Sequence, residues 1–284
     1  MSDSTAQPGS ALTPPSRALI LFFRLYLPWY LRRHFHALRL ANAERLQHAS
    51  SPLVLYLNHA SWWDPLASLF LARRFFPAHR HHAPMDASAL QRYRLLAHIG
   101  MFPVEQGTRR GAAQFLRAAS EVLSTPQSIL WVTPQGAFTD VRTRPVVFKP
   151  GLAALLARNS HAVAIPLAIE YTYWDERLPE ILINVGEPLR FDALASQLEI
   201  EAKLASGMQA AQDALAALAI ERNPAAFDTL VSGSAGVGLA YDLWRRTLAL
   251  LRGQSYRSEH TLHPPQATGA ADTEIVPQRS APHA

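Results

Sequence analysis

Short apolar runs alternate with helical segments between residues 53 and 222, and this order constrains the fold more than any other feature of the sequence. Compact apolar runs are typical of buried strands, whereas apolar residues at helical spacing indicate helices that cover a core. Strands that alternate with helices favour an α/β fold, here with a mixed central sheet and helices on both faces. The expected strands are 53–57, 128–132, 163–169 and 181–185, and the expected helices are 65–76, 111–123, 152–158 and 194–222.

Prolines lie at the ends of several of these segments and inside one of them. Pro77 and Pro126 each follow an expected helix, and Pro224 follows the last one. A proline cannot continue a helix, because it lacks the amide hydrogen and clashes with the preceding turn. Pro166 lies inside the expected strand 163–169, where it removes a ladder hydrogen bond, so we expect an edge position or a bulge there.

The N-terminal part contains an apolar stretch, residues 18–31, that carries Arg24 and is broken by Pro28. A membrane-spanning helix needs about 20 apolar residues, so this stretch is short for a crossing. Basic and apolar residues alternate after it, and such a pattern is typical of a helix that lies in a membrane interface. The alternative is a helix that packs on the protein's own core. We expect no cleavable signal peptide.

These features divide the chain into expected regions. Residues 1–16 form a disordered tail, 17–50 form membrane-docking amphipathic helices, and 51–225 form the α/β domain. Residues 226–253 form an amphipathic appendage, which either docks on the membrane or closes the core. Residues 254–284 are rich in proline, histidine and serine and form a second disordered tail.

Composition excludes several classes of protein. The 284 residues are 49% apolar and 17% charged, whereas a disordered chain is poor in apolar residues and high in net charge. The absence of cysteine excludes a disulfide framework, a cysteine-ligated zinc site and a cysteine nucleophile. Lysine and arginine number 27 against 22 acidic residues, and the net charge of +5 fits a partner that carries phosphate groups.

The most informative string is NHASWWD, residues 58–64, directly after the first expected strand. Residues five apart on a regular helix point about 140° away from each other, so His59 and Asp64 could not easily touch on one. Pro65 suits the first turn of a helix, with Asp64 or Ser61 as its N-cap. His59 therefore lies in the turn before the helix, and Asp64 can fold back toward its imidazole. This turn lies at the carboxyl end of a strand, where open α/β sheets bind ligands.

A histidine next to a carboxylate provides a general base. The imidazole of His59 can take a proton from an alcohol, and Asp64 can fix the tautomer and stabilise the imidazolium. Considered alone, a histidine and an aspartate at this spacing are more often structural residues of a loop. The residues that follow decide between the two interpretations.

Five blocks in sequence resemble the glycerolipid (lysophospholipid) acyltransferase family, which includes the 1-acylglycerol-3-phosphate acyltransferases. They are NHASWWD at 58–64, GMFPVE at 100–105, TPQGAFT at 133–139, FKPG at 148–151 and VAIP at 163–166. The resemblance covers about half of the chain.

The resemblance implies a reaction and its partners. A fatty acyl group passes from an acyl thioester, acyl-CoA or acyl carrier protein, to a lipid hydroxyl, with His59 as base and Asp64 as its orienting acid. It implies no cofactor and no metal ion, and a role in phospholipid biosynthesis. We further expect a peripheral, monotopic protein on the cytoplasmic face of the inner cell membrane, with a lipid surface and no nucleic acid as partner.

The third block departs from the family pattern FPEGTRS. Gln135 replaces its glutamate and Phe138 replaces its arginine, although a phosphate contact needs a cation. Either nearby arginines bind the acceptor's phosphate, or the acceptor is a non-phosphate lipid such as a glycolipid or an ornithine-type lipid, which we favour. The candidate acceptor-binding residues are Arg109, Gln135, Gly136 and Arg144, with Arg110, Arg142 and Lys149 as further cations.

Two rival functions share this sequence pattern. One is a catalytically inactive lipid-binding protein of the same fold, and the other is a thioesterase that uses water as acceptor. The remaining clusters are weaker signals. His79, His81 and His82 are more typical of a solvated basic loop than of a metal site. Trp62 and Trp63 either line an acyl channel or pack in the core.

Overall fold

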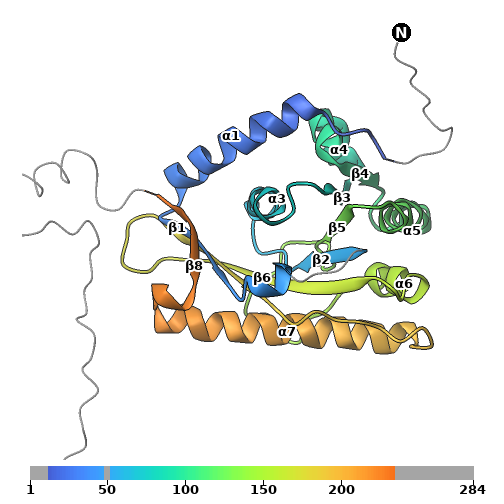
Figure 1. Cartoon of the computed structure of the whole chain (residues 1–284). Helices are drawn as coiled ribbons and strands as arrows, with labels where there is room; N and C mark the ends of the chain where they lie inside the picture. Colours follow the sequence, from blue (N-terminus) through green and yellow to red (C-terminus); the bar gives the residue numbers. More distant parts are fainter. Residues whose placement is uncertain (1–11, 48–51, 234–284) are drawn as a thin grey trace, which may run out of the picture.

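The computed structural model describes residues 12–47 and 52–233, and this part of the chain forms one eight-stranded sheet between layers of helices (Figure 1). The strands are β1 (Ala37–Ala41), β2 (Leu53–Leu57), β3 (Arg80–Asp86), β4 (Met101–Val104), β5 (Ser128–Val132), β6 (Val163–Thr172), β7 (Glu180–Val185) and β8 (Asp228–Ser232). Their order across the sheet is β4-β3-β5-β2-β6-β7-β1-β8.

The sheet is mixed, as predicted. Strands β4, β3, β5, β2 and β6 are parallel neighbours, whereas β7 runs antiparallel to β6. Strand β1 is parallel to β7, and β8 closes that edge in the antiparallel direction. The carboxyl ends of five adjacent strands therefore meet along one edge of the sheet, which is the edge where open α/β sheets bind ligands.

Helices cover both faces, also as predicted. They are α1 (Arg17–His34), α2 (Glu44–Gln47), α3 (Asp64–Phe75), α4 (Ala87–Arg92), α5 (Arg109–Ser124), α6 (Gly151–Arg158) and α7 (Gln197–Glu221), with 3₁₀ turns η1 (Arg94–Ile99) and η2 (Pro224–Ala226). Helices α5, α6 and α7 bury side chains in one core cluster, and α1 and α3 bury theirs in a second one across the sheet.

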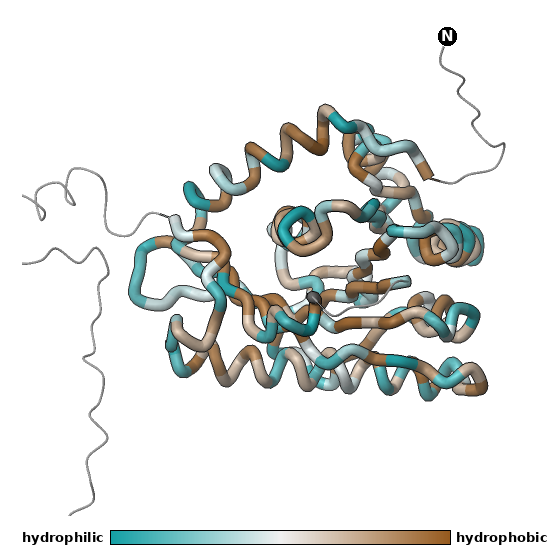
Figure 2. Tube along the Cα trace, in the orientation of Figure 1, coloured by the Kyte–Doolittle hydropathy of each residue, from teal (hydrophilic) through white to brown (hydrophobic). Residues whose placement is uncertain are grey.

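The two cores explain why the central strands are apolar throughout. In β5, Leu130 packs in the core under α5 and α6, whereas its neighbours Ile129 and Trp131 pack in the core under α3. A strand covered on both faces has no solvent side, so it reads as a continuous apolar run instead of an alternating one. Figure 2 shows these apolar segments concentrated in the strands between the helical layers.

Pro166 lies in the central strand β6, opposite Tyr56 of β2. The regular pairing of β6 with β7 begins only at Leu167, one residue later, and an isolated bridge joins Ala164 to Leu189. The β7 ladder thus starts after the proline, which has no amide hydrogen to donate. The expected edge position or bulge is wrong, because β6 is a central strand and its pairing with β2 continues through Pro166 without a register shift.

The structure corrects the expected N-terminal helices. The helix ends at His34, and residues 37–41 form the fully buried strand β1 between β7 and β8. The sequence ALRLA carries a basic residue among apolar ones, so it resembled part of an amphipathic helix. In the structure it lies between two strands, where both of its faces are buried. None of the described helices is long and apolar enough to cross a membrane.

Three further strands were not expected. Residues 228–232 of the expected appendage form β8, whereas residues 234–253 lie outside the described part of the chain. The expected basic loop at residues 79–82 is wrong, since His81 and His82 are buried in β3. Strand β4 holds the second family block and contains Pro103. All three contain polar residues or proline, so none of them stands out in the sequence as an apolar run.

Candidate active site

His59 and Asp64 are in direct contact in the turn between β2 and α3. The Nδ1 atom of His59 lies 2.8 Å from Oδ2 of Asp64, and the same oxygen accepts a hydrogen bond of 3.0 Å from the amide of Ser61. The Asp64 side chain is only 2% exposed, whereas the imidazole is 21% exposed and reachable from solvent. Because Nδ1 faces the carboxylate, Nε2 is the ring nitrogen that can exchange a proton with a substrate.

The local chain geometry creates this contact. The amide of Asp64 donates to the carbonyl of Ser61 at 3.2 Å, which closes a tight turn, and α3 begins at Asp64 with Pro65 in its first turn. The residue before the helix is Trp63, which makes no side-chain cap, so the expected capping by Asp64 or Ser61 is wrong. The carboxylate of Asp64 is directed back to the turn, where it serves the histidine and the Ser61 amide.

Tyr171 is a second partner of Asp64 that sequence analysis missed. Its hydroxyl donates a hydrogen bond of 2.8 Å to Oδ1 of Asp64 from the carboxyl end of β6. Burial, followed by the charge of Asp64 and this hydrogen bond, raises the pKa of Tyr171 far above its usual value. The phenol therefore stays protonated and holds Asp64 as an acceptor. The sequence does contain a feature that could have indicated this contact, namely a tyrosine at the end of a buried strand that pairs with β2.

Asn58 anchors the turn to β6. Its side-chain amide donates to the carbonyl of Ile169 at 3.0 Å, and its side-chain oxygen accepts from the amide of the same residue at 2.8 Å. Asn58 is 1% exposed, so both of its hydrogen-bonding groups would be left unpaired without this match. These two hydrogen bonds extend the β2–β6 pairing by one residue through a side chain instead of the backbone. They fix the position of the chain where His59 follows the strand.

The third family block packs directly on His59. The backbone amide of His59 donates to Oε1 of Gln135 at 2.6 Å, and its carbonyl accepts from the amide of Thr139 at 2.8 Å. The ring of Phe138 lies 4.3 Å from the imidazole, centroid to centroid, and is itself 58% exposed. Gln135 thus supports the backbone of the His59 turn, and Phe138 covers one side of the ring with an apolar surface.

Lys149 brings a cation to this turn. Its backbone amide donates to the carbonyl of Pro134 at 2.9 Å, and its ammonium lies 3.5 Å from the carbonyl oxygen of Gly136. Gly136 has a φ of 65°, and a Cβ atom at this position would lie 2.5 Å from Nζ of Lys149. Glycine is therefore favoured here by its left-handed backbone conformation, whereas the flexible lysine side chain could move aside.

The predicted acceptor-binding residues separate in space. Gln135 and Gly136 belong to the turn beside His59, as described above. Arg144 instead pairs with Asp213 of α7 at 2.5 Å and donates to the carbonyls of Val141 and Thr143. Arg109 is the first residue of α5, and no contact in the described part of the chain links it to the His59 turn.

The two further arginines also have acidic partners. Arg142 pairs with Asp140 at 2.8 Å, and Arg110 lies 3.6 Å from Glu105. A cation that is already paired with a carboxylate gives a weaker contact to an incoming phosphate. Lys149 has no such acidic partner among the described residues.

The histidines after Pro77 have structural contacts. The Nε2 atom of His81 lies 3.0 Å from the carbonyl of Phe76, and its Nδ1 accepts from the indole of Trp131 at 3.1 Å. Burial, with the nearby charge of Arg73, lowers the pKa of His81 to about 3, so this ring is neutral. In residues 12–47 and 52–233, no group of three or more histidine or acidic side chains could hold a metal ion.

Comparisons with known proteins identify the domain that contains this site. Residues 37–170, which include His59 and Asp64, match the sequence model of a family described as Acyltransferase. One similar solved structure is that of the 1-acyl-sn-glycerophosphate (LPA) acyltransferase PlsC from Thermotoga maritima. Its identity is 12% and its TM-score 0.49, over 70% of this chain and 79% of that chain. No curated protein sequence matches the chain. The acyltransferase domain expected from the sequence motifs is thus confirmed over residues 37–170, just under half of the chain.

Proposed function

We propose that the protein is a membrane-associated O-acyltransferase that transfers a fatty acyl group from an acyl thioester to a lipid hydroxyl. The observation that carries this proposal is the contact between His59 and Asp64, at the ligand-binding edge of the sheet and within the segment that matches the family. The imidazole is accessible and its partner is buried, which is the arrangement that a general base requires.

The proposed reaction proceeds in two steps without a covalent enzyme intermediate. Nε2 of His59 takes the proton of the acceptor hydroxyl while that oxygen bonds to the thioester carbonyl carbon. The resulting tetrahedral intermediate then breaks its carbon–sulfur bond, and the imidazolium returns the proton to the departing thiolate. Asp64 stabilises the imidazolium between these steps, and Tyr171 keeps the carboxylate in place.

The donor in this proposal is acyl-CoA or an acylated carrier protein, as a co-substrate. All bonds that form and break belong to the two substrates and the imidazole, so the proposed chemistry needs neither a cofactor nor a metal ion. A lipid surface supplies the acceptor and receives the product, and nucleic acid has no role in it. The product of such a transfer to a lysophospholipid is a membrane phospholipid.

The acceptor is either a lysophospholipid, such as lysophosphatidic acid, or a lipid without phosphate. Phe138 in place of the family arginine favours the second class, because an apolar ring cannot bind a phosphate. The ammonium of Lys149 supports the first, because it supplies a cation at Gly136, next to the glutamine that contacts the His59 backbone. An assay that offers lysophosphatidic acid and a monoacylated glycolipid side by side decides between them.

Replacing Lys149 with methionine tests the lysine's role in acceptor binding. A hydrogen bond to a charged group contributes about 1.5–3 kcal/mol, so the KM for lysophosphatidic acid should rise by about 10- to 100-fold. The KM for an uncharged monoacylglycerol should change little. Arg142→Met is the matched control, since Arg142 is exposed and paired with Asp140. Equal effects of Lys149→Met on both acceptors would contradict phosphate binding by Lys149 and favour the non-phosphate acceptor.

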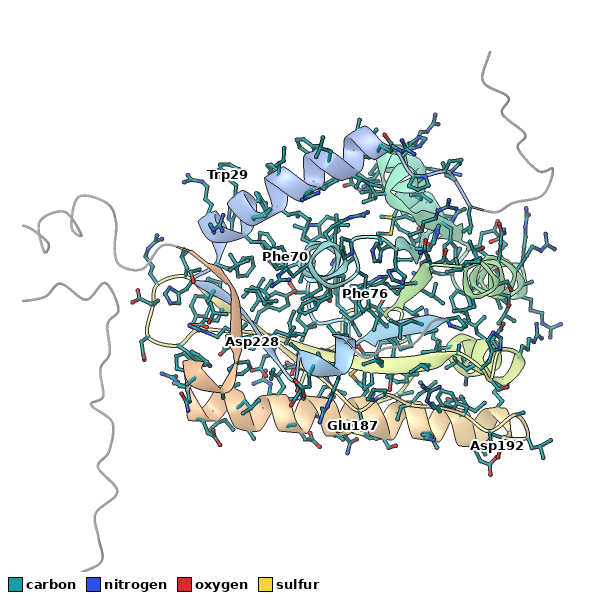
Figure 3. All side chains as sticks on the ribbon, in the orientation of Figure 1. Trp29, Phe70, Phe76, Glu187, Asp192 and Asp228 are labelled. Atoms are coloured by element: carbon teal, nitrogen blue, oxygen red, sulfur yellow. The ribbon has the colours of Figure 1, made fainter. Side chains whose placement is uncertain are left out.

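Helix α1 supports attachment to a membrane surface. Its outer side exposes large apolar residues, Leu21, Phe22, Leu25 and Trp29, by 53–71%. Figure 3 shows Trp29 on the outer side of α1, whereas Phe70 and Phe76 lie on the inner side, toward the sheet. An amphipathic helix of this kind binds in the interface of a bilayer. Because acyl thioesters are made in the cytosol, we place the protein on the cytoplasmic face of the inner cell membrane as a peripheral, monotopic protein.

The double substitution Leu25→Ser and Trp29→Ser tests this attachment. Burying one large apolar side chain contributes about 1.5–3 kcal/mol, so the partition to lipid vesicles should fall by about tenfold or more in a sedimentation assay. The control is Leu198→Ser on α7, which is 76% exposed on the other side of the sheet. Unchanged sedimentation of the α1 variant would remove α1 as the anchor. Deleting residues 16–40 is unsuitable, because it removes most of β1 from the sheet.

A further inference from the structure

A groove of about 600 Å³ runs between α5 and α6 on the outside of the protein, and none of the residues that line it belongs to the His59 turn. Three arginines surround it, one at the start of α5, one in its middle and one at the end of α6. The positions between them carry small or apolar side chains. The residues are Arg109, Arg117 and Arg158, with Ala112, Ala113 and Leu116 between them.

The groove follows one stripe of α5. Residues 109, 112, 113, 116 and 117 are spaced by three and four positions, so they share a face of the helix. Arg109 and Arg117 are eight residues apart, which places them about 12 Å from each other along the axis. The two alanines between them leave the helix backbone open to close approach by a partner. A row of cations around a shallow apolar strip fits an elongated anionic surface better than a single small ion.

The three arginines have no acidic partner among residues 12–47 and 52–233. Some other surface arginines do have one: Arg144 pairs with Asp213, and Arg222 lies 3.5 Å from Asp175. Uncompensated charges of one sign on one face attract a partner of opposite charge and accelerate its association. The charge of the groove is thus available to another molecule instead of to the fold itself.

We propose that this α5–α6 groove docks an acidic carrier protein that delivers the acyl group on its thioester arm; this inference rests on the proposed acyl transfer. Helices α5 and α6 pack on the face of the sheet opposite α1 and α3 (Figure 1), so a membrane bound by α1 leaves the groove free for a soluble partner. The groove has no aromatic lining on which an adenine could stack, which disfavours the nucleotide of coenzyme A as its occupant.

The groove lies within reach of His59. Four residues separate the end of β4 from the start of α5, which lies at the same edge of the sheet as the His59 turn. Strand β4 is separated from β2 by β3 and β5, and three strand spacings correspond to about 14 Å. At the start of α6, Gly151 faces the ring of Phe115 of α5. A long flexible thioester arm can therefore extend from the rim of the groove toward the reacting centre.

Charge reversal tests the docking surface. Full-length protein in detergent is titrated with palmitoyl-acyl carrier protein that carries a fluorescent label, and binding is followed by anisotropy at low and high salt. The Arg117→Glu, Arg158→Glu double variant should raise the Kd at least about tenfold, and the wild-type affinity should fall as salt rises. The double variant with lysine at both positions should restore most of the binding. Arg177→Glu, an exposed arginine of the β6–β7 loop, is the matched control.

The outcomes separate the docking surface from the proposed function. If wild-type protein transfers palmitoyl groups from palmitoyl-CoA but does not bind the acylated carrier protein, the docking proposal is wrong and the acyl transfer stands. Equal binding by the wild type and the charge-reversal variant also overturns it. An equal loss of vesicle binding, or of transfer from palmitoyl-CoA, would assign the groove to lipid or to a nucleotide. If neither thioester supports transfer, the proposed function fails and the docking proposal fails with it.

Discussion

Replacing His59 with alanine should lower the rate of acyl transfer by about 100- to 10,000-fold, because general base catalysis contributes a factor of this size. The fold should persist, since the imidazole is partly exposed and the two backbone hydrogen bonds of His59 do not involve its side chain. The measurement is the initial rate of ester formation from palmitoyl-CoA and a lysolipid, together with the thermal unfolding temperature.

His161→Ala is the matched control for this substitution. His161 is exposed in the turn after α6, on the α5–α6 side of the sheet, and it has no role in the proposed chemistry. We expect wild-type rates for this variant. A His59→Ala protein with wild-type rates and an unchanged unfolding temperature would show that another group is the base.

Replacing Asp64 with asparagine should have the second-largest effect, again about 100- to 10,000-fold. The amide of asparagine can donate to Nδ1 of His59, which leaves the proton on Nε2 and blocks this nitrogen as a base. The substitution also removes a buried negative charge that accepts hydrogen bonds from Ser61 and Tyr171. The rate and the pH profile of transfer measure this effect.

Tyr171→Phe is a milder variant that tests the same carboxylate as Asp64→Asn. It keeps the ring in place and removes only the hydrogen bond to Oδ1 of Asp64, so we expect a loss of about tenfold. If Asp64→Asn instead retained nearly full activity, the carboxylate would serve only to shape the turn through the amide of Ser61. If Tyr171→Phe were as damaging as Asp64→Asn, the phenol itself would have a direct part in the reaction.

The order of apolar runs was sufficient to predict the centre of the fold. Strands β2, β5 and β7 and helices α3, α5 and α6 lie within one or two residues of the expected ranges, because each is bounded by residues that end or start an element. The strands at both ends of the sheet were not predicted. Strand β3 begins with the polar string RHH, and its pairing with the apolar β5 gives it a buried place that its own sequence does not show.

The contact of His59 with Asp64 could be inferred from the strand, the turn and Pro65, which together direct the carboxylate back toward the imidazole. The other partners are brought to the site by tertiary structure. Tyr171 lies 107 positions from Asp64 in the sequence, and Gln135 lies 76 positions from His59. Parallel pairing of β6 and β5 with β2 brings both to the same edge. Tertiary structure also determines the place of Arg144. This residue is close to the third block in the sequence, but it pairs with Asp213 of α7.

The most direct test follows both products of the reaction at once. Purified protein is incubated with palmitoyl-CoA and a lysolipid that it accepts, while the free thiol is quantified by a colorimetric reagent and the lipids by mass spectrometry. We predict one new acyl ester for each thiol released, with both products absent when His59 is replaced by alanine. Thiol release accompanied by free palmitate and no new ester would identify a thioesterase, and no thiol release from either palmitoyl-CoA or palmitoyl-acyl carrier protein would identify a lipid-binding protein; either result would contradict acyl transfer by His59.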